Sequence, residues 1–253
     1  MTLSKENWGK SPRRSLPRRY KMLRVLTYNI HFGKRLTRII SWIANQETAD
    51  VICLQEFPIM HLTQFYRSLP RGVWGHRFTR SFILRKKTYT LVTLFRREKL
   101  RLVKTKTLLM GVHPMEKSIL RNPMEKSCLV TTFRAGKKTC TVANTHLVWL
   151  AANRSRYKQI QLIINHLSSC RHASIITGDF NLHSIKTNKK LIEFMNTYRF
   201  KTLPTRLATH RFGFIKHQLD YVFASKCTLL KLEAPRVRFS DHYPVIANVR
   251  LSH

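Results

Sequence analysis

Acidic residues are scarce in this chain. Only 12 of its 253 residues are Asp or Glu, against 47 Lys and Arg, so the formal net charge is +35. A charge of this size exceeds what solubility requires and attracts polyanions. Hydrophobic residues still make up 43% of the sequence, which excludes a disordered basic protein. We therefore expect the charge to lie on a folded domain with a polyanionic partner.

Cysteine is also sparse. The chain has five cysteines, an odd number, and none forms a CxxC pair or a zinc-type spacing. We interpret them as reduced, buried thiols of a cytoplasmic protein, because free cysteine packs like a small hydrophobe and disulfides are rare in that compartment. They are Cys53, Cys128, Cys140, Cys170 and Cys227.

Long apolar runs are missing as well. No stretch reaches the ~18 consecutive apolar residues typical of a membrane-spanning helix. The basic N-terminal segment is not followed by the apolar core of a signal peptide. The sequence thus disfavours membrane insertion and secretion by the usual signal. Residues 1–21 combine many Lys and Arg with two prolines, which predicts a flexible basic arm before one folded domain at 22–253.

From Met22 onward, the hydrophobic pattern alternates between runs typical of buried strands and spacings typical of amphipathic helices. Strands are predicted at 23–30, 50–56, up to Gly178, 219–224 and 244–251, with paired antiparallel strands at 81–95 and 128–145 around the turn Ala135-Gly136-Lys137. Helices are predicted at 36–44, 157–167 and 189–198. Mixed strands with interspersed helices predict an α/β layered sandwich.

Several of the rare carboxylates stand at the ends of predicted strands. They are Glu56, Asp179, Asp220 and Asp241. A carboxylate at such a place is costly unless it is paired, hydrogen-bonded or bound to metal, and hard oxygen ligands suit Mg²⁺ rather than zinc. For any one of them taken alone, a salt bridge or a turn cap is the better interpretation.

Five short segments set these residues in a context. In chain order they are TYNIH at 27–31, LQE at 54–56, NTHL at 144–147, GDFN at 178–181 and SDHYP at 240–244. This ordered set closely resembles the endonuclease/exonuclease/phosphatase superfamily. A further segment, LDYVF at 219–223, resembles the family strand whose aspartate supports the final histidine. The resemblance spans residues 22–251 and implies a DNase I-like, four-layer α/β sandwich of two packed mixed β-sheets flanked by helices.

The resemblance also implies a metal site and a catalytic domain over residues 22–253. By position, Glu56 would be the principal Mg²⁺ ligand, and Asn29 and Asp241 would complete its shell; Mn²⁺ is a possible substitute. Two carboxylates and an amide leave room for water and a phosphate oxygen.

The same positional transfer assigns roles in hydrolysis. Asp179 would orient or deprotonate the attacking water, and Asn181, two residues on in an extended turn, would donate to the phosphoryl oxygens. His242 would contact the scissile phosphate, with Asp220 fixing its tautomer and favouring its charged form. His146 would add a second imidazole. Further candidates for substrate contacts are His31, His183, His210, Arg121 and Lys126.

The superfamily acts on many phosphoesters, so the family resemblance alone does not identify the substrate. The charge of the chain is the main criterion for predicting it. Lys and Arg that neutralise phosphates give sequence-independent affinity for nucleic acid. A basic cluster lies in one hairpin-like region, at Arg77, Arg80, Arg85, Lys86, Lys87, Arg96, Arg97, Lys99 and Arg101. We therefore expect a nuclease that acts on DNA or RNA, with DNA the favoured substrate. Two alternatives stay open: a phosphoesterase of lipids or inositol phosphates, and a member that only binds nucleic acid.

Overall fold

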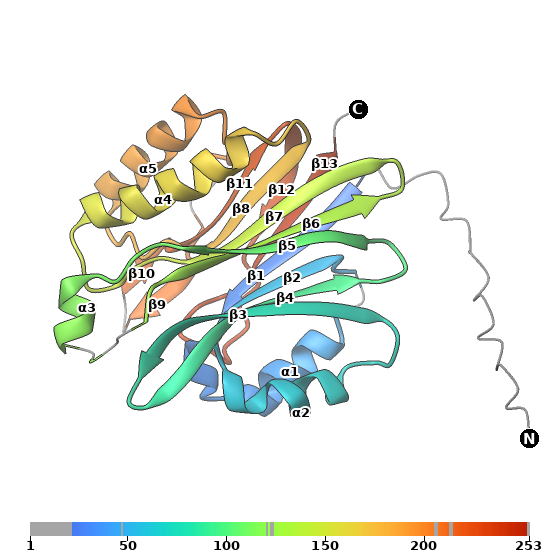
Figure 1. Ribbon diagram of the computed structural model, residues 1–253, viewed down its shortest axis with the longest axis horizontal. Helices are drawn as coiled ribbons and strands as arrows, with labels where there is room; N and C mark the ends of the chain where they lie inside the picture. The colour runs from blue at the N-terminus through green and yellow to red at the C-terminus, as the bar shows by residue number, and fades with distance from the viewer. Residues whose placement is uncertain are drawn as a thin grey trace, which may run out of the picture.

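Two β-sheets pack face to face between two layers of helices (Figure 1). This arrangement comes from a computed structural model that describes residues 22–46, 48–119, 121, 124–204, 207–212 and 215–251. The predicted basic arm, residues 1–21, lies outside the described residues. The α/β sandwich predicted from the sequence is confirmed, with helices, sheet, sheet and helices as the four layers.

The first sheet has six strands in the order β12-β13-β1-β2-β4-β3. Their bounds are β1 Met22–Asn29, β2 Val51–Pro58, β3 Trp74–Leu84, β4 Lys87–Arg96, β12 Cys227–Glu233 and β13 Val245–Leu251. Only β1 and β2 run parallel. Helices α1 (Leu36–Ala44) and α2 (Leu62–Ser68), with the short turn η2 (Ile59–His61), pack their apolar residues on its outer face. A second short turn, η1 (His31–Gly33), follows β1.

The second sheet has five strands in the order β11-β8-β7-β6-β5. Their bounds are β5 Arg101–Leu109, β6 Ser127–Ala135, β7 Lys138–His146, β8 Ala173–Asp179 and β11 Asp220–Ser225. Here β7 and β8 are the parallel pair. Helices α4 (Asn153–Ser168) and α5 (Ile185–Thr197) cover its outer face, and α3 (Pro114–Ile119) and the pair β9 (His210–Phe212) and β10 (Ile215–His217) lie beside it.

Strand direction gathers the ends of six strands at one edge of the sandwich, here called the site edge. The parallel pairs β1–β2 and β7–β8 end there, and β11 and β13 begin there because each runs antiparallel to a neighbour. The register places Asp179 opposite both His146 and Asp220. Residues far apart in the sequence thus meet through ordinary ladder pairing.

Elements that are short or mostly exposed escaped the sequence prediction. These are α2, α3, β5, β9, β10 and β12. Strand β5 is an edge strand whose residues are mostly exposed, so it lacks the alternating pattern of a half-buried strand. The predicted segment 81–95 is two strands joined at Arg85 and Lys86, whose φ angles are 49° and 62°, as in tight hairpin turns. The expectation of five buried thiols is wrong for Cys170 and Cys227, which are partly exposed at element ends.

One buried amide locks the two sheets together behind the site edge. The Asn144 Nδ2 group of β7 donates to the main-chain oxygens of Leu54 and Val92 across the interface, at 3.2 and 3.0 Å. Its Oδ1 accepts from Gln55 Nε2 at 2.8 Å. Because buried polar groups are costly when unpaired, these three bonds fix how β7 sits against β2 and β4.

Replacing Asn144 by Leu should therefore lower the free energy of unfolding by about 3 kcal/mol, since it keeps the volume but leaves buried partners unpaired. Urea unfolding measures the change. The control Asn196→Leu, at an exposed position of α5, should stay within about 0.5 kcal/mol of the parent. Equal losses in the two variants would contradict this role.

Candidate functional site

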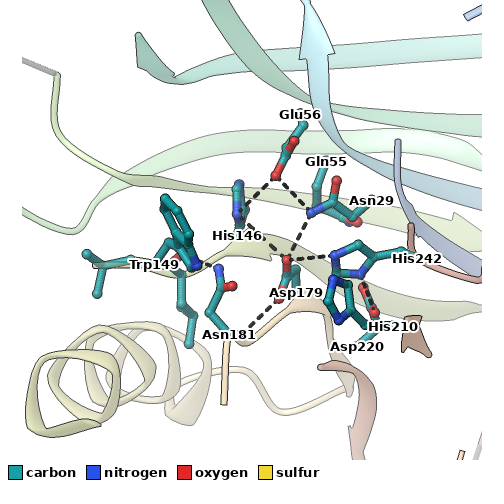
Figure 2. A network of polar contacts seen from close by, with 12 residues as sticks. Asn29, Gln55, Glu56, His146, Trp149, Asp179, Asn181, His210, Asp220 and His242 are labelled. Carbon is teal, nitrogen blue, oxygen red and sulfur yellow. Dashed lines mark hydrogen bonds and ion pairs between the residues drawn. The ribbon is translucent and has the colours of Figure 1, made fainter. Parts of the chain in front are cut away.

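The amide of Asn29 joins two buried carboxylates at the site edge. Its Nδ2 donates to Glu56 Oε1 at 3.0 Å and to Asp179 Oδ2 at 2.9 Å (Figure 2). Its Oδ1 accepts from the main-chain N–H of His31 at 3.0 Å, which fixes the orientation of the amide. Asn29 ends β1 and Asp179 ends β8, so this contact also ties one sheet to the other.

A β-bulge aims Glu56 into the site. The β2–β4 register shifts between Leu54 and Phe57, and Glu56 has a φ of 60°. A bulge re-aims a side chain, and non-glycine residues are held at positive φ only when their surroundings fix them. Here Glu56 Oε2 accepts from the main-chain N–H of Phe32 at 3.0 Å. The sequence predicts a strand ending at Glu56; the structure continues it to Pro58.

Burial makes both carboxylates costly to ionise. Glu56 is 8% exposed and Asp179 1% exposed. Burial raises the pKa of Glu56, an effect that the hydrogen bond from Asn29 opposes. Burial likewise raises the pKa of Asp179, against the opposing charge of His242. No Lys or Arg forms an ion pair with either carboxylate within the described part of the chain.

His242 and Asp220 form a buried charged pair beside Asp179. His242 Nδ1 lies 2.7 Å from Asp220 Oδ2, and His242 Nε2 lies 3.8 Å from Asp179 Oδ2. Burial alone would lower the pKa of His242, but Asp220, Asp179 and Asp241 together raise it to about 10. Thr209 holds Asp220 in place, because its hydroxyl accepts from the Asp220 N–H at 3.0 Å. His242 is therefore a cation at neutral pH.

His146 is a second imidazole with the opposite charge state. Its Nε2 lies 3.7 Å from Glu56 Oε1 and 3.8 Å from Asp179 Oδ2. Burial, together with the charges of Lys126 and His242, holds its pKa well below the usual range. The ring packs edge-on against Phe82 of β3, with centroids 5.5 Å apart. The site thus combines one neutral and one charged imidazole.

Asp241 stands at the rim rather than between the other carboxylates. Its Oδ2 pairs with His31 Nδ1 and lies 3.9 Å from His210 Nε2. Burial alone would raise its pKa, but the hydrogen bond from His31 and the charge of His242 lower it to about 2. Ser240 links it to β1, since its Oγ contacts the Asn29 main-chain oxygen at 2.8 Å and Asp241 Oδ1 at 3.1 Å.

Asn181 differs from the expected geometry. Its φ is 52°, so the turn after Asp179 is left-handed and not extended. Its main-chain N–H donates to Asp179 Oδ1 at 2.8 Å, and its Nδ2 donates to the Leu147 oxygen at 3.0 Å. The predicted extended turn is therefore wrong, and Asp179 and Asn181 lie in contact through the Asn181 N–H (Figure 2).

The weaker candidates separate into near and distant residues. Lys126 is buried, lies 4.4 Å from the Phe82 ring centroid, and faces Glu116 at 3.8 Å. His183 is exposed, and its main-chain oxygen is 2.7 Å from His217 Nδ1. Arg121 is exposed and contacts none of the site residues. The structure therefore brings His31, Lys126 and His183 around the site and leaves Arg121 outside.

Sequence reasoning missed several supporting residues. Gln55, Phe82, Glu116, Thr209 and Ser240 all contact the groups described above. Gln55 and Ser240 lie inside the segments LQE and SDHYP, so the motifs themselves could have identified these two residues. The other three come from segments without a motif, and only the fold brings them to the site edge.

A hard divalent cation fits the chemistry at Glu56. The buried carboxylate is held by neutral donors, Asn29 Nδ2 and the Phe32 N–H, which leaves its charge uncompensated. Carboxylate and amide oxygens are the ligands that Mg²⁺ prefers. Within the described residues, two other groups have metal-ligand spacing: Asp179, Asp220 and His242, and His210, Asp241 and His242. Both use His242, which is already charged and paired with Asp220, so we regard them as less suited.

Chemically, the arrangement supplies a base, a cation and a cation-binding carboxylate within one small volume. Asp179, with its raised pKa, sits between the Asn29 amide and the His242 imidazolium. Perturbed, mutually facing groups of this kind are typical of acid–base sites.

Solved structures share this fold. The endonuclease/exonuclease/phosphatase from Bacteroides vulgatus is 18% identical, with a TM-score of 0.71 over 91% of this chain and 99% of that one. The human Nocturnin catalytic domain with bound sulfate anion is 18% identical, with a TM-score of 0.70 over 92% and 95%. ANGEL2, a 2′,3′-cyclic phosphatase, in complex with adenosine-2′,3′-vanadate, is 18% identical, with a TM-score of 0.68 over 91% and 96%. At such identities the likeness shows the fold alone.

Sequence comparison supplies the family. A search of curated proteins gave no significant match. The model of the Endonuclease/Exonuclease/phosphatase family, by contrast, matches residues 26–242, a range that contains all six quoted segments except the last two residues of SDHYP. The chain therefore belongs to the endonuclease/exonuclease/phosphatase family of phosphoesterases.

Proposed function

We propose that this protein is a Mg²⁺-dependent phosphodiesterase that hydrolyses the backbone of nucleic acid, DNA in preference to RNA. The observation that carries the proposal is the contact of Asn29 with both Glu56 and Asp179, flanked by His146 and His242. It supports the proposal because Glu56, the proposed metal ligand, and Asp179, the proposed base, are joined by one amide. The net charge of +35 supports a polyanionic substrate.

In this proposal Glu56 is the principal metal ligand, with the Asn29 oxygen and Asp241 as further ligands. The bound ion would polarise a phosphoryl oxygen. Asn29 presents its NH₂ group to the carboxylates, so its oxygen serves as a ligand only after the amide turns over. Asp241 reaches the same region through Ser240, which contacts both it and the main chain of Asn29.

Asp179 would accept the proton of the attacking water. Burial raises its pKa, which brings a carboxylate closer to the value of an effective base near neutral pH. The charged His242 would bind a phosphoryl oxygen, with Asp220 holding its ring in position. Asn181 would donate to the same phosphoryl group with the amide hydrogen that does not reach Leu147. The neutral His146 would act as a phosphate ligand or as a general acid.

Exposed basic residues support nucleic acid as the substrate. On β5, the exposed side chains include Arg101, Lys104 and Lys106, and the edge strand β3 adds Arg77 and Arg80. The structural neighbour ANGEL2 is a 2′,3′-cyclic phosphatase whose structure holds adenosine-2′,3′-vanadate, which likewise supports a substrate of the nucleotide class.

A lipid or inositol-phosphate phosphoesterase is the second candidate, and one observation favours it. Apolar side chains stand exposed near the site edge, with Trp149 at 51%, Met115 at 48% and Ile119 at 60%. The Trp149 N–H donates to Glu116 Oε1 at 2.7 Å, so the loop after β7 and α3 are adjacent. Such a rim suits a membrane surface. No helix within the described residues is long and apolar enough to cross a membrane.

Mg²⁺ should stabilise the protein through Glu56. At a concentration of 100 Kd, the ion should add about 2.7 kcal/mol, which is a rise of roughly 5 to 10 °C in Tm for a domain of this size. Glu56→Gln should remove the rise, whereas Glu98→Gln, at an exposed position between β4 and β5, should keep it. Differential scanning calorimetry in EDTA and in Mg²⁺ measures both, and a full rise in the Glu56 variant would exclude that ligand.

Asp179→Asn should lower kcat on DNA by about 10² to 10⁴-fold, because it removes the base while keeping the shape of the side chain. KM should change little, since the proposed role is in the transition state. Steady-state kinetics with Mg²⁺ tests this against Glu98→Ala as the control. A kcat equal to that of the parent would refute the assignment.

A substrate panel separates the two candidates. Plasmid DNA, single-stranded DNA, RNA, inositol phosphates and sphingomyelin vesicles are incubated with Mg²⁺ at one salt concentration. Turnover of DNA, abolished by EDTA, is expected. Turnover of vesicles or inositol phosphates alone would replace the nuclease with the second candidate.

A further inference from the structure

A pocket of about 590 Å³ lies away from the site edge. It is bounded by α2, by the connection from α2 to β3, by the start of β3 and by the residue after β4. We call it the arginine pocket and define it by Tyr66, Arg67, Arg71, Trp74, His76 and Arg97. The site edge lies toward the opposite end of β3, where Phe82 contacts the ring of His146.

The pocket is rich in positive charge. Arg67, Arg71 and Arg97 are exposed, and none of its lining residues is acidic. Within the ranges that the structure describes, none of these three guanidinium groups forms an ion pair with a carboxylate. Three uncompensated guanidinium groups around one hollow favour an anion, and the planar fork of arginine matches a phosphate group.

Two stacked aromatic rings form one side of the pocket. The Tyr66 and His76 rings stack with centroids 3.5 Å apart and planes 13° apart. Arg97 Nε donates to the Trp74 main-chain oxygen at 3.0 Å, so its guanidinium is held in place. Burial and the charges of Arg77 and Arg97 lower the pKa of His76, which reflects the positive potential here. The pocket is therefore built by packing and does not depend on flexible side chains alone.

Strand β3 connects this pocket to the site edge. It is the edge strand of its sheet (Figure 1). From His76 to Phe82 it advances ~20 Å at the usual rise per residue. Between them, Arg77, Phe78 and Arg80 are exposed. Basic side chains with an interleaved aromatic are what a nucleic-acid strand contacts, through its phosphates and bases.

We propose that the arginine pocket binds a backbone phosphate of the same nucleic-acid strand that is cleaved at the site edge, about six nucleotides from the scissile bond at ~3.4 Å per nucleotide. This inference rests on the proposed nuclease function. Arg97 of the basic cluster, together with Arg67 and Arg71 outside that cluster, would then contact one defined phosphate. The cluster would not act only as a diffuse positive surface. At ~3.4 Å per nucleotide, a strand of 4 nucleotides spans ~14 Å, which is less than the ~20 Å between the pocket and the site edge. The pocket contact should therefore strengthen the binding of longer strands only.

The test compares Arg67→Ala/Arg71→Ala with the control Lys189→Ala/Lys190→Ala in the full chain. The control pair is exposed on α5, on the opposite face of the sandwich, and removes the same charge. Fluorescence anisotropy in EDTA measures binding of labelled 4- and 20-nucleotide DNA over a range of salt concentrations, without cleavage. Cleavage of both strands with Mg²⁺ is measured separately.

The pocket variant should bind the 20-nucleotide strand about tenfold more weakly at 0.15 M salt, with a salt slope reduced by about 0.7, because the contact with one phosphate is lost. Its affinity for the 4-nucleotide strand and its Tm should equal those of the parent. The control variant should lose much less affinity for the 20-nucleotide strand than the pocket variant does. Equal losses in the two variants, or equal losses on both strands, would overturn the inference, as would a parent that does not bind the longer strand.

The same variants separate this inference from the proposed function. Mg²⁺-dependent cleavage of DNA with no specific loss in the pocket variant overturns the pocket contact and leaves the nuclease in place. Absence of cleavage on any strand refutes the nuclease. If AMP binds the parent but not the pocket variant, and the 20-nucleotide strand shows no pocket effect, the pocket holds a free nucleotide and the strand contact is wrong.

Discussion

Two buried carboxylates that share one amide are the constraint on which the rest of this structure depends. Glu56 and Asp179 come from different sheets, and Asn29 holds both through a single Nδ2 group. In a chain with 47 basic residues, no Lys or Arg among the described residues forms an ion pair with either one. His242, whose Nε2 lies 3.8 Å from Asp179 Oδ2, brings a positive charge close to them, and it is itself paired with Asp220. The protein thus keeps a negative centre inside a strongly positive molecule.

The fold supplies the precision that such a centre needs. Parallel pairs in each sheet bring four strand ends to one edge, and the antiparallel neighbours return Asp220 and His242 to it. A bulge in β2 turns Glu56 inward. Behind these groups, Asn144 and Gln55 fix one sheet against the other. These strand ends, the bulge and the contacts between the sheets position the charged groups through backbone geometry. Little side-chain entropy should therefore be lost when substrate binds.

The sequence predicted what its patterns encode locally. Buried strands such as β2 and β8, and the amphipathic helices α1 and α4, follow from hydrophobic periodicity, and the ordered segments identified the family. Asp220 and His242 were expected as a pair, and the structure brings them to 2.7 Å. The left-handed turn at Asn181, the bulge at Glu56 and the support from Thr209 depend on tertiary contacts that leave no local signal. The edge strand β5 was missed because it buries too little to show a period. Helix α2 was missed because it has only seven residues, although Leu62 and Phe65 are buried at helical spacing.

Positive and negative side chains occupy different parts of the molecule. Its basic side chains lie exposed along β3, β5 and the arginine pocket, while the acidic groups of the site are buried behind them. In the proposed function, a polyanion drawn to the surface would meet a site where a bound cation would compensate Glu56 and Asp179. The most direct test is a crystal structure grown with Mn²⁺ and measured for anomalous scattering. The account predicts a peak within coordination distance of the Glu56 carboxylate. A peak only among His210, Asp241 and His242, with none at Glu56, would contradict it.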